Sequence, residues 1–590
     1  MAPTPVAPPP PSSGFDRAQA LRRLAEQPFD VLVVGGGVTG CGVALDAAAR
    51  GLRTALVERR DFAWGTSSRS SKLVHGGLRY LQQGDLGLVA EALRERQRLL
   101  RNAPHLVQPL TFLIPLFGRG GVVSASVRRA IGTALWLYDL AGGIRIGKVH
   151  RRVGADEAQA LLPSLRPDRL VAGFLYYDAT ADDARLALSL ARTAACDFGA
   201  TVANYCEAVA IRHDETGAAC GATLALRGPG ERGELEVRAS VVVNATGAWA
   251  DDVRALDEGT HPRTTRPAKG VHLTLPAERL PAKAAAVLPV PGDRRTIFVV
   301  PFPDGADTYV GTTDTAYDGP LDDAACEPED VEYLLSALQE ATTAEVGPGD
   351  VTGVWAGVRP LLAPEQGGAP GGRRAAAKAA RTADLSRRHR VLLAPSGVVT
   401  VTGGKLTTYR QMAEDTVDLV VRRLGPAAPP GVRRCPTRRL RLRAASPRPG
   451  PEADPLTRHL HSRYGSEAPA VLALAEGRPE LLEPLVPGLP DRRVEVLWAA
   501  RQEMALTVED VLTRRTRLRL RRAEQAAAVA EDVARLLAEA QGRPIEELLD
   551  EARASAAAIR AELARALAGV EASRPGPATQ DTASPTGGAR

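Results

Sequence analysis

The hydrophobic pattern of the chain begins with the signature of a βαβ unit. Residues 29–34 form an apolar run of strand length, and Gly35-Gly36-Gly37 ends it. Apolar and small residues then recur at helical density over 38–50, and 53–57 is a second short apolar run. The pattern predicts a strand, a helix and a second strand, with a glycine-rich turn between the first strand and the helix.

Three later apolar runs also end in small residues. Residues 239–243 lead into Asn244-Ala245-Thr246-Gly247, residues 309–314 end similarly, and residues 398–401 lead into Thr402-Gly403-Gly404-Lys405-Leu406-Thr407-Thr408-Tyr409. A helix is predicted directly after the last of these motifs. We expect the strands to return the chain repeatedly to one ligand, while the segments between them build a second sheet.

Beyond residue 425 the pattern loses its strand signals. Residues 426–455 are rich in Pro and Arg and predict a linker, after which helical periodicity returns in four stretches, 456–473, 492–505, 521–541 and 544–567. The chain is predicted to begin with a disordered Pro/Ala-rich tail over 1–28 and to end with a disordered tail over 573–590. Residues 29–425 are predicted to form a cofactor domain interleaved with a substrate domain, whose sheet lies in roughly 105–190 and 265–350. After the linker, residues 456–572 are predicted to form a separate helical domain. Residues 367–381 predict an exposed loop insertion.

Composition narrows the class of protein. The 590 residues are 44% hydrophobic, enough for two or three globular domains. The net charge of +6 comes from dispersed arginines rather than from a localised stripe, so no nucleic-acid partner is expected. The six cysteines form no CxxC pair and no metal set is predicted. Neither a signal peptide nor a membrane-spanning segment is expected.

The turn at residues 35–40 carries the first candidate chemistry. Gly35 makes the turn, Gly37 lets backbone approach a pyrophosphate, and Gly40 lets the helix pack on the strand. Glu58 ends the second strand, where a carboxylate meets a ribose hydroxyl. The order predicts dinucleotide binding; the alternative is a glycine-rich turn without a ligand.

Residues 66–81 concentrate cationic and backbone chemistry shortly after this unit. Lys72, His75, Gly76-Gly77 and Arg79 fall within one short stretch, and bare glycine backbone beside fixed positive charge suits an anionic ligand. Only six of the 75 basic residues are lysine. Lys72, Lys269 and Lys405 lie in motifs flanked by Gly or Ser. Lysine is kept at these three positions either for a functional role or by chance.

Six motifs occur in a characteristic order. They are residues 66–81, Val243-Asn244-Ala245-Thr246-Gly247, Lys269-Gly270-Val271-His272, Gly311-Thr312-Thr313-Asp314, Gly357-Val358-Arg359-Pro360 and Gly403-Gly404-Lys405-Leu406-Thr407-Thr408-Tyr409. Together they resemble the FAD-dependent glycerol-3-phosphate dehydrogenase family, the respiratory enzymes rather than the soluble NAD-dependent ones. The resemblance covers about residues 29–518.

The resemblance implies an α/β fold: a Rossmann-like FAD-binding domain of the glutathione-reductase type, a β-rich substrate domain and a C-terminal all-α domain. It also implies oxidation of sn-glycerol 3-phosphate to dihydroxyacetone phosphate, with electrons passed to a membrane quinone. The location implied is the cytoplasm, with peripheral contact on the inner face of the membrane. A homodimer is an open possibility.

Motifs and resemblance together assign a set of cofactor residues. They are Gly35, Gly36, Gly37, Thr39, Gly40, Glu58, Thr66, Ser67, Ser68, Ser71, Lys72, His75, Gly76, Gly77, Ala245, Thr246, Gly247, Asp314, Gly404, Lys405, Leu406 and Thr407. We expect residues 67–75 to lie toward the flavin and Arg79 with Tyr80 to lie toward the substrate phosphate.

Oxidation of a secondary alcohol also needs a base and an anchor for the phosphate. An imidazole suits the base, and His272 is favoured over His75 because its strand is expected to face the substrate. Either histidine is equally well explained as a buried structural residue. A guanidinium fork matches phosphate oxygens, so Arg79 and Arg359, with Lys405 as a point charge and Tyr80 as a donor, are the expected phosphate site. Arg359 and Lys405 also count as candidate catalytic residues.

Three alternatives stay open at this stage. An oxygen-using glycerol phosphate oxidase shares the motifs, whereas an amino-acid oxidase does not need several converging cations. A non-catalytic flavoprotein scaffold predicts bound FAD that substrate does not reduce. Residues 127–146 fit either a helix in a membrane interface or an ordinary core helix.

Overall fold

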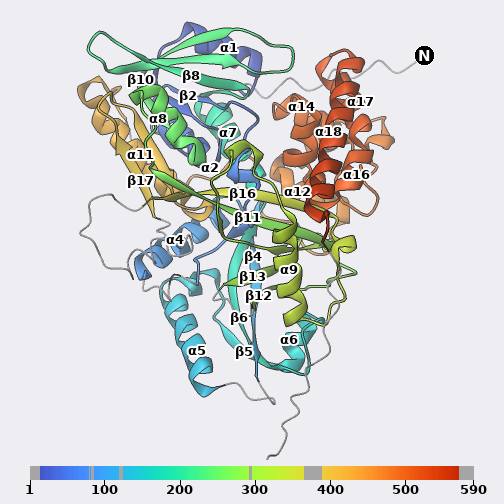
Figure 1. The fold of residues 1–590 in the computed structure, drawn as a ribbon. Coiled ribbons are helices and arrows are strands. Elements are labelled where there is room, and N and C mark those ends of the chain that lie inside the picture. The colour runs from blue at the N-terminus through green and yellow to red at the C-terminus, as the bar shows by residue number, and fades with distance from the viewer. Residues whose placement is uncertain are drawn as a thin grey trace, which may run out of the picture.

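The computed structural model describes residues 14–78, 80, 85–118, 124–290, 295–363, 388–432 and 434–570. Two sheets form the centre of the molecule, and helices from the end of the chain pack along one side (Figure 1). The predicted insertion at 367–381 and the predicted tail at 573–590 lie outside the described residues.

The first sheet contains the predicted βαβ unit. Its strand order is β17-β18-β10-β1-β2-β7, and β8 and β9 extend it through β10. The strands are β1 (Phe29–Val34), β2 (Thr54–Val57), β7 (Thr201–Ala203), β8 (Cys206–His213), β9 (Ala219–Leu226), β10 (Glu234–Asn244), β17 (His389–Leu393) and β18 (Val399–Gly403). β1 runs parallel to β2 and β10, and β18 runs parallel to β10. The carboxyl ends of these parallel strands therefore share one edge, where ligands bind in open α/β sheets.

Helices cover the apolar faces of this sheet. The helices α2 (Val38–Ala49), α7 (Asp183–Phe198) and α11 (Tyr409–Leu424) pack in one core against β1, β10 and β18. α8 (Ala250–Glu258) packs beside β8. Strand β1 is buried along its whole length, which explains its continuous apolar run.

The N-terminal region differs from its prediction. Helix α1 (Arg17–Glu26) occupies part of the stretch expected to be a disordered tail. Asp16 caps it by accepting a hydrogen bond from the Gln19 N–H, and Ala20 and Leu24, four residues apart, are buried in the core beneath β1 and β10. The Pro-rich composition before it masked this short amphipathic pattern. Residues 1–13 lie outside the described residues.

The second sheet has ten strands in the order β15-β11-β14-β13-β12-β4-β6-β3, with β16 paired to β11 and β5 to β6. They are β3 (Leu73–Val74), β4 (Val107–Phe117), β5 (Arg151–Gly154), β6 (Leu170–Ala181), β11 (Thr265–Pro276), β12 (Ala285–Pro289), β13 (Thr296–Pro301), β14 (Asp307–Gly311), β15 (Thr315–Ala316) and β16 (Gly353–Leu362). Their helices are α4 (Leu86–Asn102), α5 (Ala125–Leu140), α6 (Ala155–Leu161) and α9 (Pro328–Ala341). Residues 309–314, predicted to approach the cofactor, begin within β14 of this sheet.

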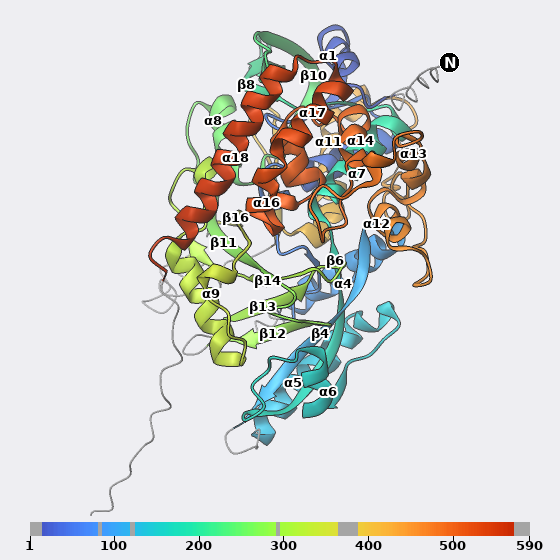
Figure 2. The same ribbon diagram turned by 90° about the vertical axis from the view of Figure 1, so that its right-hand side faces the viewer.

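The C-terminal region is helical, as predicted. Its helices are α12 (Pro455–Tyr464), α13 (Ala468–Ala473), α14 (Val494–Gln502), α15 (Leu518–Arg521), α16 (Ala523–Ala528), α17 (Ala530–Gln541) and α18 (Ile545–Leu567). Their apolar faces join the same hydrophobic core as β11, β16 and α9, and α18 runs down to α9 (Figure 2). The region was expected to be a separate domain, but it shares its core with the second sheet.

Two further observations bear on the class of protein. All six cysteines are free, with no disulfide between them. Among the described helices, none combines the length and apolar composition needed to cross a bilayer.

Candidate functional site

A cavity of about 530 Å³ opens at the carboxyl ends of β1, β10 and β18. Many of the residues predicted to bind the cofactor line it: Gly35, Gly37, Thr39, Glu58, Thr66, Ser67, Ala245, Thr246, Gly247, Gly404, Lys405 and Leu406. Three separate strand ends thus converge on one cavity. That these strand ends contact one ligand stays a prediction, which their convergence on one cavity supports.

The glycine-rich turn is shaped by close backbone approach. Gly35 has φ of +111°, a conformation that side chains disfavour. A Cβ on Gly40 would overlap the carbonyl oxygen of Gly35, so only glycine lets α2 begin this close to β1. The N-terminus of α2 then faces the cavity, where its positive dipole end suits a pyrophosphate, and its first N–H, of Val38, donates to Ser67 Oγ at 2.9 Å.

Glu58 is fixed at the end of β2 by two backbone groups. Its Oε2 accepts a hydrogen bond from the Gly36 N–H at 2.7 Å, and its Oε1 accepts one from the Arg60 N–H at 3.0 Å. Burial raises the pKa of Glu58, although both hydrogen bonds favour its charged form. A carboxylate held here is placed to accept from a ribose hydroxyl.

Two tryptophans that the sequence reasoning missed shape another wall of this cavity. The rings of Trp64 and Trp249 lie 5.7 Å apart, and the guanidinium of Arg59 lies 4.9 Å from the Trp249 ring centre. A Cβ on Gly65 would come within 2.8 Å of the Trp249 ring, so this glycine admits the indole. The one signal of this wall in the sequence was Gly65, the residue directly before the 66–81 motif.

The remaining predicted cofactor residues are not part of the cavity lining. They are Gly36, Gly40, Ser68, Ser71, Lys72, His75, Gly76, Gly77, Asp314 and Thr407. Gly36 and Gly40 support the turn instead. Lys72 lies against Asp183 at 3.8 Å and the Trp355 ring at 4.4 Å, and Asp314 lies 3.3 Å from Arg359. Ser71 contacts His272. Within the 66–81 segment, Thr66 and Ser67 line the cavity, Ser71 and Lys72 contact side chains of the second sheet, and the predicted flavin contacts of the others stay a prediction.

His272 lies on β11, buried between β14 and β16. Its Nε2 is 2.8 Å from Ser71 Oγ, and its ring stacks on the Trp355 indole. A Cβ on Gly311 would overlap the imidazole, so the glycine at the end of β14 provides the space that the ring occupies. Position 311 therefore needs a glycine to leave space for the imidazole. The sequence pattern had suggested that the small residue here marks an approach of the chain to the cofactor.

The protonation of His272 follows from its surroundings. Burial, and then the positive charges of Lys72 and Arg359, hold its pKa well below the usual value near 6.5. The ring is thus neutral at pH 7. Within the described part of the chain its buried Nδ1 has no hydrogen-bond partner. If Nε2–H donates to Ser71, the Nδ1 lone pair is left to accept a proton.

Arg359 lies on β16 directly beside this histidine's strand. Its Nη2 donates to Thr312 Oγ1 at 3.0 Å, and its Nη1 lies 3.3 Å from Asp314 Oδ1. A Cβ on Gly270 of β11 would overlap the guanidinium, so Gly270 lets Arg359 lie across the strand. Pro360, the next residue, lines the cofactor cavity. β16 therefore contributes Pro360 to the cavity, while the guanidinium of Arg359 contacts Thr312 and Asp314 of the second sheet region.

Lys405 provides a second positive charge, which lies over the ring of Tyr80. The Lys405 Nζ lies 4.2 Å from the Tyr80 ring centre, and Gly77 leaves room for that ring. The His75 N–H donates to Thr407 Oγ1 at 3.2 Å, which joins the 66–81 segment to the turn carrying Lys405. Arg79, the remaining predicted phosphate ligand, lies outside the described residues.

The two sides of the 66–81 segment explain how these groups meet. On one side Thr66 Oγ1 donates to the Val358 carbonyl of β16 at 2.5 Å, and on the other His75 contacts Thr407. β3 within the segment also pairs with β6. The segment therefore connects the first sheet's cofactor cavity to the second sheet's buried histidine and arginine.

The comparisons with known proteins agree with this geometry. Residues 30–410 match the family model described as FAD dependent oxidoreductase, and residues 441–547 match the C-terminal domain of alpha-glycerophosphate oxidase. Glycerol-3-phosphate dehydrogenase 2 of Mycobacterium tuberculosis is 38% identical over 540 residues, 89% of this chain and 87% of the relative. The mitochondrial glycerol-3-phosphate dehydrogenase of Mus musculus is 37% identical over 85% of this chain and 69% of its own length.

A solved structure supports the fold and the cofactor. The glycerol-3-phosphate dehydrogenase from Bacillus halodurans, complexed with FAD, is 29% identical with a TM-score of 0.70, covering 93% of this chain and 97% of that one. The glycine turn, the fixed Glu58 carboxylate and the cavity between them fit an FAD dinucleotide, as predicted. From these matches and this site, we conclude that the chain belongs to the FAD-dependent glycerol-3-phosphate dehydrogenase family.

Proposed function

We propose that this protein oxidises sn-glycerol 3-phosphate to dihydroxyacetone phosphate and passes the electrons to a membrane quinone. The observation that carries the proposal is the buried, neutral His272, whose Nδ1 has no partner in the described structure, on the strand next to Arg359. A base and an anion anchor on adjacent strands, beside a flavin cavity, match the two demands of the reaction.

The oxidation removes a hydride from C2 and a proton from its hydroxyl, and bound FAD supplies the hydride acceptor. His272 Nδ1 takes the hydroxyl proton, so the ring becomes a cation as the C2–O bond becomes a carbonyl. Ser71 and Trp355 hold the imidazole in place for this transfer. The alternative base is His75, whose backbone N–H donates to Thr407 Oγ1.

The phosphate is bound by cations that approach from both sheets. Arg359 presents a guanidinium fixed by Thr312 and Asp314, and Lys405 adds a positive charge beside Tyr80. Arg79 completes the proposed anchor. Paired charges and forked donors suit a dianionic phosphate ester better than a single carboxylate, which argues against an amino-acid substrate.

Delivery to a quinone requires contact with a membrane, and α5 offers the surface for it. Trp136 is 58% exposed and Leu140 is 77% exposed, and Leu137 on the same helix and Ile144 in the short turn after it are also exposed. Arg128 and Arg129 on the same helix are exposed. The helix lies at one end of the molecule, away from the C-terminal helices (Figure 1). The exposed apolar face favours an interfacial helix over the core helix that the sequence left open.

Steady-state turnover tests the proposal. Holoenzyme with an artificial dye acceptor under nitrogen should oxidise glycerol 3-phosphate, with little activity on glycerol. Equal activity on both alcohols would contradict the proposed phosphate anchor.

The match to a glycerophosphate oxidase C-terminal domain favours one second candidate, an oxygen-using oxidase. Peroxide release in air at a rate equal to dye reduction would establish that candidate. Quinone-dependent turnover with little peroxide supports the quinone proposal. Co-sedimentation with anionic vesicles, reduced by Trp136→Ser with Leu140→Ser, supports the membrane contact, and unchanged sedimentation would refute it.

A further inference from the structure

A second cavity, of about 700 Å³, lies between the C-terminal helices and the second sheet. One wall comes from α12 and residues 484–492, and the opposite wall comes from the ends of β6 and β14 and from residues 516–521. It shares no lining residue with the cofactor cavity. The proposed reaction does not use it.

The lining is strongly cationic. Eight of its side chains are Lys or Arg, against three aspartates, Asp182, Asp304 and Asp491. The cations are Lys72, Arg185, Arg448, Arg458, Arg463, Arg492, Arg517 and Arg521. A concave surface lined by one sign of charge focuses its potential and attracts ions of the opposite sign.

Some of these cations are neutralised by neighbouring carboxylates. Arg521 pairs with Asp304 at 2.7 Å and with Asp307, while Arg517 pairs with Asp182 at 3.0 Å and with Asp183. Arg185 pairs with Glu503 at 2.6 Å. These pairs form the framework of the walls and leave little net charge of their own.

Three other arginines have no carboxylate partner within the described ranges. Arg448 donates only to the carbonyls of Pro104 and His105 and to Gln108, and Arg458 donates to the carbonyls of Pro451 and Ala453. The side chain of Arg492 makes no hydrogen bond in this part of the structure, and its Nε is buried. The surplus positive charge therefore lies on one side of the cavity.

Burial disfavours the charged forms of two groups beside this wall. Burial without a carboxylate lowers the pKa of Arg448 to about 10. Burial and then the charges of Arg185, His461 and Arg448 lower the pKa of His105 to about 3. Arg463 also has a buried Nη2 without a hydrogen-bond acceptor among the described residues. The wall thus has cationic donors for which the described chain supplies no acceptor.

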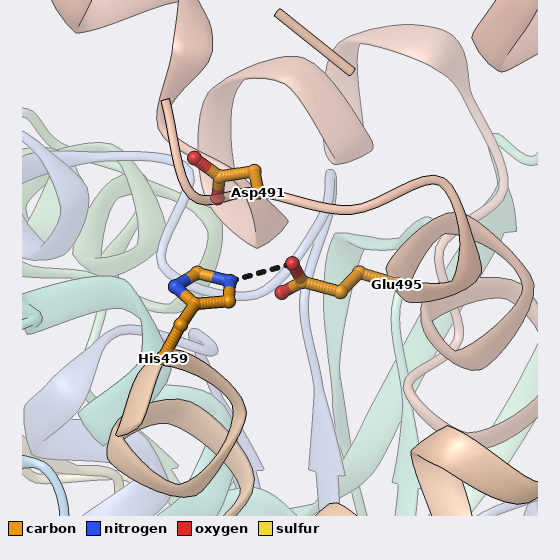
Figure 3. A group of neighbouring side chains, drawn as sticks. All are labelled: His459, Asp491 and Glu495. Carbon is orange, nitrogen blue, oxygen red and sulfur yellow. Dashed lines mark hydrogen bonds and ion pairs between the residues drawn. The ribbon is translucent and has the colours of Figure 1, made fainter. Parts of the chain in front are cut away.

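A cluster of possible metal ligands adjoins the same wall. His459, Asp491 and Glu495 place ligand atoms within 4.8 Å of one another, and His459 binds Glu495 (Figure 3). The Arg463 guanidinium lies 3.0 Å from Glu495 and 3.7 Å from Asp491. Because Arg463 pairs with both carboxylates and His459 pairs with Glu495, the cluster is better explained as an ion network that holds Arg463 in the wall than as a metal centre.

We propose that this second cavity binds a small organic polyanion, a phosphate ester or a polycarboxylate, through Arg448, Arg458 and Arg492. The guanidinium fork fits either oxyanion. The lining also includes Phe302, Tyr309 and Leu106, which give the carbon skeleton of such a ligand an apolar surface. The volume exceeds what an inorganic ion needs.

Calorimetric titration of the full-length holoenzyme tests the site. The Arg359→Gln background weakens anion binding at the candidate active site, and inorganic pyrophosphate and citrate serve as the two probes. In that background we expect one of them to bind at one site per chain. Tighter binding of pyrophosphate identifies phosphate esters as the ligand source, and tighter binding of citrate identifies polycarboxylates.

Adding Arg458→Gln and Arg492→Gln should raise the Kd about tenfold or more, because two charged hydrogen-bonding groups are lost. The matched control adds Arg535→Gln and Arg553→Gln, two exposed arginines outside the cavity, and should leave the Kd unchanged. Flavin content and melting temperature confirm that each variant is folded. Absence of binding by both probes, or equal affinity in the cavity variant and the control, would overturn the proposal.

Discussion

The imidazole of His272 and the indole of Trp355 lie face to face, with ring centroids 4.7 Å apart and an interplanar angle of 7°. The two residues are direct partners in the register of β11 and β16. Sheet pairing therefore fixes the plane of the candidate base, while Ser71 fixes its rotation through Nε2. These two constraints leave the Nδ1 edge of the ring without a hydrogen-bond partner among the described residues.

Replacing Trp355 by leucine should lower kcat about tenfold or more while changing KM little, because the histidine loses its stacking support but the phosphate anchor is intact. Trp355→Phe keeps an aromatic face and should retain more activity. Steady-state kinetics with flavin content as a control measure this. Equal kcat in the leucine variant and the wild type would show that the stack does not position the base.

The pH profile follows from the lowered pKa of His272. Only the neutral ring accepts a proton, so activity should stay constant as pH falls from neutrality and decline only as pH passes through the lowered value. The acid limb of kcat/KM should therefore lie below pH 6.5. A limb centred above that value would contradict the assignment of His272 as the buried base.

His272→Gln should lower kcat/KM by roughly 100-fold to 10,000-fold, the usual contribution of general base catalysis, without loss of flavin. The matched control is His213→Gln, which alters a partly exposed histidine paired with Asp257. That variant should keep its activity. The same comparison made with His75→Gln decides between the two histidines, and a larger loss there would transfer the role to His75.

Gly270→Ala should weaken substrate binding, because the new methyl group would overlap the Arg359 guanidinium. KM for glycerol 3-phosphate should rise about tenfold or more, with smaller effects on flavin binding. Gly349→Ala adds the same methyl group in open space and is the control. An unchanged KM in Gly270→Ala would indicate that Arg359 does not hold the phosphate.

Glu58→Gln should weaken flavin retention, since the neutral amide is a poorer acceptor for the Gly36 N–H and for a ribose hydroxyl. The fraction of flavin lost on gel filtration measures the change. Glu207→Gln, at the same cavity but paired with the exposed Arg227, provides a comparison that should lose less. Equal retention in Glu58→Gln and wild type would remove Glu58 from the cofactor site.

The sequence was most informative where local pattern alone decides structure. The apolar run before Gly35 is buried on both faces as β1, and the helical stretches after residue 455 form helices. Helix α1 was missed because a short buried stripe, Ala20 and Leu24, follows a Pro-rich segment. The C-terminal helices were expected to form a separate domain, but they share a hydrophobic core with the second sheet. The hydrophobic periodicity of a helix shows which face is buried and does not show which distant segment covers that face.

The candidate functional site was likewise predictable only where a local sequence motif determines the structure. Gly35, Glu58 and the Ala245-Thr246-Gly247 turn were predicted because each has a local motif. The stacking of His272 on Trp355 depends on strand register, which joins residues 83 positions apart. Ser71 and Asp314 were assigned to the cofactor by their motifs, yet they contact His272 and Arg359. Sequence identified the residues, and tertiary pairing determined their partners.

Anaerobic titration of the oxidised holoenzyme with sn-glycerol 3-phosphate tests the central claim most directly. The account predicts that the substrate bleaches the visible absorbance of the flavin, with glycerol at the same concentration leaving it unchanged. An unaltered flavin spectrum in folded, flavin-loaded protein would contradict the account.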